Sequence, residues 1–141
     1  MVQELSFSAI HLVTTAWEKV RQKHPNVGEQ VLIRLFDLDP AVKRLFADNG
    51  MGTKIHGKRI AEFIEVANIL LGPDVDTLSD FLSSMGARHL GRGVTKEHFV
   101  HLGQALCNVM KDHLAVEWNL EIEQACQAIF SEMTRCILTY M

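Results

Sequence analysis

The sequence predicts an all-α domain of about seven helices, and three observations support this fold class. Apolar residues recur at the spacing of a buried helix face along almost the whole chain. Breaks in this pattern fall at proline and glycine, with short connections between the helical segments. Aromatic residues make up only 7% of the chain, fewer than we expect of a β-sandwich. With 141 residues, no internal repeat and no linker-like stretch, residues 1–141 are interpreted as one domain.

The first three helices are marked by apolar stripes and by the residues that interrupt them. Ser8 is a good N-cap residue for a first helix, which the segment 24–26 (His-Pro-Asn) ends. Apolar residues over 27–36 predict a second helix. Asp39 can cap a short third helix that runs to Phe46, and Pro40 suits its first position.

Four longer helices complete the predicted fold. A glycine-rich turn over 48–52 precedes a helix from Thr53 to about Leu71, where Gly-Pro stops it. The next helix covers about 75–90 and is ended by glycines at 91 and 93. Thr95 can cap the helix that follows, and a last apolar stripe from Ile122 to Ile137 defines a helix that reaches the C-terminus.

Charge, hydropathy and cysteine content exclude several classes of protein. The net charge is -3 and the Lys and Arg residues are scattered, so we expect no nucleic-acid partner. Apolar runs are far shorter than the ~18 residues of a membrane span, and the first residues do not resemble a signal peptide. Cys107, Cys126 and Cys136 are odd in number and form no CxxC motif. We therefore expect packing roles for them in a reducing compartment, and a cytoplasmic protein.

Two of the seven histidines lie on apolar helix faces. His89 follows an apolar stripe in its helix, and His56 begins another in the helix before it. A single histidine on such a face is more often a core residue than a ligand. Two on consecutive helices suggest a metal between them, or a metal on one and its ligand beneath the other, because each buried imidazole has two nitrogens to satisfy. The others are expected to be solvated, and one pair among them, His98 and His101, makes only a weak metal site. The five histidines expected to be solvated are His11, His24, His98, His101 and His113.

Glycines inside the predicted helices add an independent signal. Gly28 and Gly57 each cost a helix about 1 kcal/mol relative to alanine, which a close crossing of two backbones would explain. The alternative for Gly28 is that it only starts the second helix. Gly91 and Gly93 follow His89 almost at once, so its side chain is predicted near a helix terminus.

These residues resemble the globin family over nearly the whole chain. Trp17, the run 31–36 followed by Asp39-Pro40, and Phe46 are similar to the first helices of globins. His56-Gly57, with Gly28 opposite, is similar to the distal histidine and the helix crossing beside it. The most specific stretch resembles the proximal region of neuroglobin-like and bacterial single-domain globins. It comprises 85–89, Gly93-Val94, Phe99 and Leu102-Gly103. Only ten positions separate Phe46 from His56, a shorter segment than in myoglobin-type chains.

The resemblance implies a globin fold around a haem b, with a role for each matching residue. His89 would be the proximal iron ligand, and His56 the distal residue or a sixth ligand. Phe46 and Val94 would touch the porphyrin, Leu32 and Ile60 would line the distal pocket, and Arg59 would reach a haem propionate. Because no CxxCH motif occurs, coordination and packing alone would hold the haem.

Three functions stay open at this stage. The resemblance implies reversible binding of O2, CO or NO for storage, transport or sensing, without catalysis as its main role. An alternative is a six-coordinate, bis-histidyl globin that uses an external reductase for NO dioxygenation or nitrite reduction. Leu32 and Phe99 stand where globins specialised for NO dioxygenation carry tyrosines, which counts against that specialisation. A haem-free helical interaction module is the third reading, and a homo-oligomer is left open.

Overall fold

The computed structural model describes residues 6–47, 52–71 and 75–141, and these ranges contain seven α-helices and no strand. The all-α prediction is therefore confirmed. The helices are α1 (Phe7–Lys23), α2 (Val27–Leu38), α3 (Val42–Ala47), α4 (Thr53–Leu70), α5 (Val75–His89), α6 (Lys96–Leu114) and α7 (Leu120–Thr139). A short 3-10 turn, Ala115–Glu117, joins α6 to α7. No helix in the described ranges has both the length and the apolar character needed to cross a bilayer.

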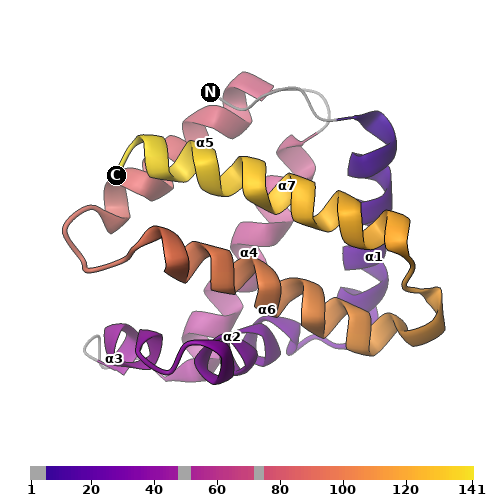
Figure 1. The fold of residues 1–141 in the computed structure, drawn as a ribbon, viewed down its shortest axis with the longest axis horizontal. Helices are drawn as coiled ribbons and strands as arrows, with labels where there is room; N and C mark the ends of the chain where they lie inside the picture. The colour runs from indigo at the N-terminus through magenta and orange to yellow at the C-terminus, as the bar shows by residue number, and fades with distance from the viewer. Residues whose placement is uncertain (1–5, 48–51, 72–74) are drawn as a thin grey trace.

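The helices cross one another in two layers. In Figure 1, α6 and α7 run side by side in opposite directions, and α4 crosses behind them. The main partners of α2 are α4 and α6, whereas α1 and α5 pack chiefly on α7. Residues far apart in the sequence are thereby brought to shared helix faces.

Two apolar clusters hold this arrangement together. The first joins α2 to α6 and includes the fully buried Leu32 and Leu106. The second joins α5 to α7 and includes the fully buried Leu82 and Ile129. Each such side chain contributes about 1.5–3 kcal/mol on burial, which makes the stripes read from the sequence the main stabilising feature.

Glycines set the closest helix crossing, between α2 and α4. A Cβ atom on Gly28 would lie 1.9 Å from the carbonyl oxygen of Gly57, and one on Gly57 would lie 2.5 Å from the Glu29 backbone nitrogen. No real side chain tolerates such contacts with backbone atoms. The close-crossing interpretation of Gly28 and Gly57 is confirmed, although Gly28 also stands in the first turn of α2.

Two of the predicted helix starts are wrong. The N-cap of α1 is Ser6, whose hydroxyl accepts a hydrogen bond from the Ala9 amide, while Ser8 lies inside the helix. Asp39 is the C-cap of α2, and its carboxylate interacts with α6 instead of capping α3. Pro40 lies outside α3. The glycine and proline predicted to end α4, together with positions 48–51 of the predicted turn, lie outside the described residues.

Candidate functional site

His89 is the last residue of α5, and the backbone of its own helix fixes its imidazole. The Nδ1 atom lies 2.8 Å from the carbonyl oxygen of Met85. Because a carbonyl can only accept, we assign the proton to Nδ1. The lone pair of Nε2 is then directed away from the helix, which is the protonation state that a metal-binding histidine uses. Gly91 and Gly93 have φ values of 75° and 78°, so the chain turns away directly after this residue, as predicted.

Two neighbouring helices position His89 from other sides. The Phe99 ring of α6 meets the His89 ring edge to face, with centroids 5.9 Å apart and planes at 74°. One turn earlier on α5, the helix approaches α7 so closely that a Cβ on Gly86 would lie 2.4 Å from the Ile137 carbonyl oxygen. Packing against α6 and α7 therefore limits the rotation and displacement of the histidine.

His56 lies at the end of the first turn of α4, directly before the crossing glycine, and is buried with 8% of its surface exposed. Its Nε2 atom is buried and has no hydrogen-bond partner among the described residues. The Phe46 ring packs edge to face against it, with centroids 4.8 Å apart. Burial lowers the pKa of His56, and the positive charge of Arg59 lowers it further. His56 is consequently a neutral imidazole with an unused nitrogen.

The chemistry of these residues fits a haem. An unpaired buried nitrogen costs a protein roughly 1–3 kcal/mol, and the described residues provide no partner for Nε2 of His56. The Nε2 of His89 offers the neutral donor that haem iron takes from a protein. Apolar side chains that could contact a flat apolar molecule belong to the two core clusters: Phe46 and Ile60 to the first, Val94 and Met85 to the second.

The other predicted site residues differ in how deeply they are buried. Leu32 is fully buried on α2, and Ile60 and Phe46 pack against the same cluster. Val94 is half-buried in the turn between α5 and α6. Arg59 is exposed on α4, near enough to affect His56 electrostatically.

Sequence reasoning missed the partners of the remaining histidines. His24 stacks on His113 with ring centroids 3.7 Å apart. His101 lies 2.9 Å from the Asp39 carboxylate, and His98 accepts a hydrogen bond from the Thr95 amide at the start of α6. The four rings are partly exposed, so they are solvated in part as expected, but each also has a partner from tertiary structure or a cap that the sequence did not predict; His11 alone of the five is exposed.

Metal-ligating side chains do not gather anywhere else in the described residues. No group of three or more His, Cys, Asp or Glu residues is arranged there to hold a metal ion. His98 accepts the Thr95 amide proton at Nδ1, so its own proton lies on Nε2 and it is poorly suited to the weak metal site considered from the sequence.

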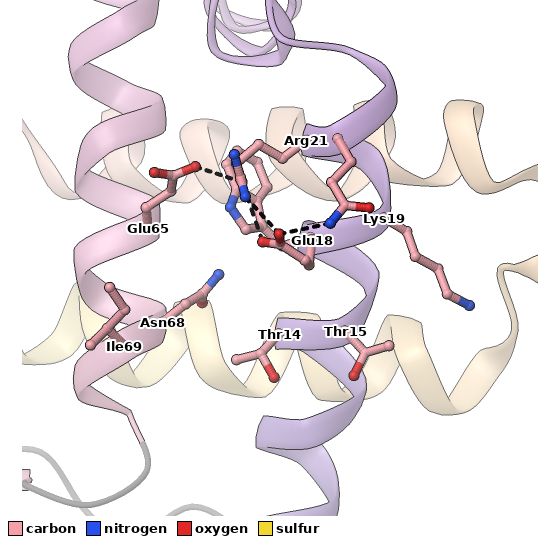
Figure 2. Close-up of a pocket in the computed structure, with 10 residues that line it drawn as sticks. Thr14, Thr15, Glu18, Lys19, Arg21, Glu65, Asn68 and Ile69 are labelled. Atoms are coloured by element: carbon pink, nitrogen blue, oxygen red, sulfur yellow. Dashed lines mark hydrogen bonds and ion pairs between the residues drawn. The ribbon is translucent and has the colours of Figure 1, made fainter.

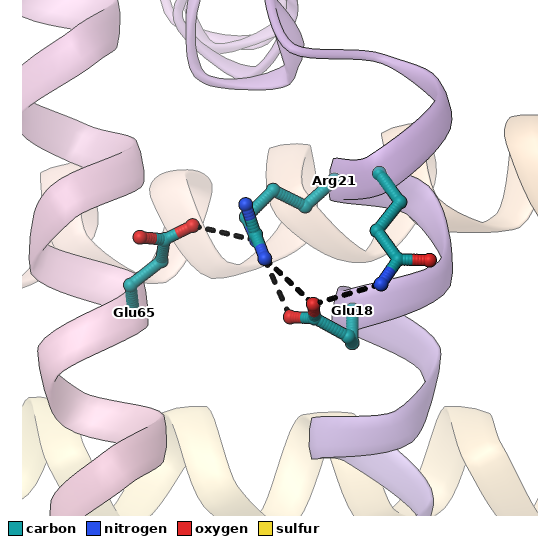
Figure 3. Close-up of polar contacts among 4 residues, drawn as sticks. Glu18, Arg21 and Glu65 are labelled. Carbon is teal, nitrogen blue, oxygen red and sulfur yellow. Dashed lines mark hydrogen bonds and ion pairs between the residues drawn. The ribbon is translucent and has the colours of Figure 1, made fainter.

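A groove between α1 and α4 is a separate feature of the surface. It has a volume of about 540 Å³ and is lined by polar and charged side chains, with no histidine among them. Figure 2 shows Arg21 reaching from α1 toward Glu65 of α4. The Arg21 guanidinium lies 2.7 Å from the Glu65 carboxylate and 2.6 Å from that of Glu18, which also accepts from Gln22 (Figure 3). These contacts tie α4, the helix of His56, to α1.

Comparison with known proteins places the chain in a family. The Globin family model matches residues 29–137. A neuroglobin of Danio rerio is 27% identical, over 92% of this chain and 88% of its own. An anaerobic nitrite reductase of Oryza sativa subsp. indica is 24% identical, over 89% of this chain and 88% of its own. Leghemoglobin 3 of Sesbania rostrata is 27% identical, over 89% and 90%. The chain belongs to the globin family.

Proposed function

We propose that this globin holds haem b without a covalent link, with His89 as the proximal ligand, and binds O2, CO or NO reversibly. The hydrogen bond between His89 Nδ1 and the Met85 carbonyl carries the proposal, because it directs the Nε2 lone pair away from α5. Ferrous haem with one neutral imidazole ligand binds a diatomic gas on its other face. Storage, transport and sensing are all compatible with this chemistry.

The environment of His56 also supports the proposal. Since burial and Arg59 lower its pKa, it stays neutral at pH 7 and retains one N–H and one lone pair. When Nε2 carries the proton, it can donate to a polar gas ligand and hold it in the pocket. The edge-to-face contact with Phe46 limits the ring to a narrow range of positions. Leu32 and Ile60 provide an apolar surrounding that excludes water.

A second function follows from the unused Nε2 of His56. If Nε2 carries the lone pair instead, His56 can serve as a sixth iron ligand that gases must displace. Such a protein could turn over NO or nitrite with an external reductase in the cytoplasm. The nitrite reductase activity in the name of the rice relative favours this candidate. Our first choice stays with gas binding, because Leu32 and Phe99 lack the hydroxyl that globins specialised for NO dioxygenation carry at these positions.

The absorption spectrum of the ferrous, ligand-free protein separates the two functions. One broad visible band indicates an open binding face and supports gas binding, whereas sharp split bands indicate two histidines on the iron. A His56→Leu variant should convert split bands to the broad form if His56 is the sixth ligand.

Replacement of His89 tests the central assignment. His89→Ala should lose haem or bind it weakly, while the matched variant His11→Ala, at an exposed position of α1, should retain it. A colourless native protein would support the haem-free alternative. A normal haem spectrum in His89→Ala would show that the proximal ligand lies elsewhere.

A further inference from the structure

We propose that Cys107 of α6 and Cys126 of α7 are a redox-active thiol pair, which a small external disulfide converts into an intramolecular disulfide between the two helices. This site is separate from the two histidines and does not depend on a bound haem. The sequence alone suggested only packing roles for the cysteines.

The register of α6 against α7 places the two cysteines opposite each other. These helices run antiparallel and side by side (Figure 1). Their contact is close at Gly103, where a Cβ atom would lie 3.4 Å from the Cβ of Phe130. Residues four apart share a helix face, so one turn forward on α6 and one turn back on α7 lead to Cys107 and Cys126.

The environment of the Cys126 thiol agrees with this placement. A side-chain hydrogen bond with Cys107 is the largest cause that raises the pKa of Cys126, and burial raises it further. Both residues also belong to the apolar cluster between α5, α6 and α7. The sulfur atoms are therefore neighbours in the folded chain, and both thiols are free.

The two thiols differ in access, which sets the order of the reaction. Cys107 is partly exposed, while Cys126 is completely buried. An external reagent consequently meets Cys107 first. Cys126, whose raised pKa keeps it protonated at neutral pH, then acts more slowly from inside.

The reaction is an ordinary thiol–disulfide exchange in two steps. The Cys107 thiolate attacks one sulfur of the external disulfide, forms a mixed disulfide and releases one small thiolate. The Cys126 thiolate then attacks the Cys107 sulfur, forms the protein disulfide and releases the second small thiolate. In total, two protein thiols are oxidised and one external disulfide is reduced to two thiols, with the protein protons passing to the products.

Cys136 provides an internal reference. It lies ten positions beyond Cys126 on α7 and is also completely buried. At 3.6 residues per turn, ten positions bring the side chain to a different face of the helix. Cys136 is therefore outside the reach of Cys107 in the folded chain.

Oxidised glutathione is the probe for this proposal. The folded, haem-loaded chain is incubated with it, quenched with acid, alkylated and digested, and the peptides are analysed by mass spectrometry. We expect a transient glutathione adduct on Cys107, followed by a Cys107–Cys126 cross-link with the loss of two hydrogens, while Cys136 is alkylated. Dithiothreitol should restore three free thiols. A permanent adduct on Cys107, a cross-link to Cys136 or a link between chains would overturn the proposal.

Cysteine variants and unfolding in urea serve as controls for the cross-linking experiment. Cys126→Ala should stop the reaction at the adduct on Cys107, and Cys136→Ala should leave the cross-link unchanged. In concentrated urea the native register is lost, and the same treatment of the wild-type chain should give mixed pairings that include Cys136. If the folded chain gives the same mixture as the unfolded one, the helix register does not select the pair.

Discussion

Replacing Gly28 by alanine should separate α2 from α4 and destabilise the protein. The added Cβ would lie 1.9 Å from the Gly57 carbonyl oxygen, whereas ordinary contact begins at 3.4 Å. The nearest obstacles are backbone atoms, which no rotamer change can remove. Overpacking a tight site costs about 1–3 kcal/mol, and we expect the upper end of that range here. Alanine recovers part of its helix propensity, which is worth at most about 1 kcal/mol. The net loss should be about 2 kcal/mol.

Gly103→Ala is the matched control for this prediction. Gly103 is also a buried helical glycine, but its added Cβ would meet only the Phe130 side chain, at 3.4 Å. The propensity gain should make this variant neutral or up to about 1 kcal/mol more stable. Urea unfolding followed by circular dichroism, with all variants in the same haem state, measures both effects. Equal midpoints for Gly28→Ala and Gly103→Ala would refute the argument from the α2–α4 crossing.

Three further predictions concern other contacts. Burial is the first cause that lowers the pKa of His113, followed by the charge of His24, while Asp112 opposes the shift; the stability contributed by neutral His113 is therefore complete above about pH 6.5 and is lost as the pH falls toward the folded-state value. His113→Gln should flatten the acid side of a stability profile measured by urea unfolding; an unchanged slope would show that His113 does not titrate differently on folding. Asp39→Ala should cost about 1 kcal/mol, because His101 loses its partner 2.9 Å away, and a His101→Ala, Asp39→Ala double-mutant cycle should return this coupling. Leu106→Ala removes a side chain that is 1% exposed and should cost about 2–5 kcal/mol in the same unfolding assay; a loss below 1 kcal/mol would mean that the cavity collapses.

The sequence predicted the helices well because each one buries a periodic apolar stripe. The apolar stripe did not distinguish Ser6 from Ser8 as N-cap, since both residue types suit the position; the coordinates show that the Ser6 hydroxyl accepts from the Ala9 amide. Stacking of His24 on His113 could not be foreseen either, because 89 positions separate the two residues.

Glycines inside helices indicate more close helix contacts than were predicted from the sequence. Gly28 and Gly57 were interpreted as a backbone crossing from their cost inside a helix. Gly86, inside α5, gives the same signal and was not interpreted, although it marks the close approach of α5 to α7. For the candidate site, the apolar stripes identified His56 and His89. The hydrogen bond from Nδ1 to Met85 and the unpaired Nε2 of His56 required coordinates.

The two histidines are positioned by different neighbours, so separate variants should disturb them one at a time. His56 precedes Gly57 at the crossing with α2, whereas His89 follows Gly86 at the contact with α7. Gly86→Ala would place a Cβ 2.4 Å from the Ile137 carbonyl oxygen and push α5 away from α7. We expect faster haem loss from Gly86→Ala, measured by transfer to an apoglobin acceptor, because the proximal ligand moves. Gly28→Ala should instead change the visible bands or the rate of CO binding, since it displaces the helix of His56. If both variants alter haem loss and CO binding to the same extent, the two histidines are not held independently, and α4 and α5 move as one unit.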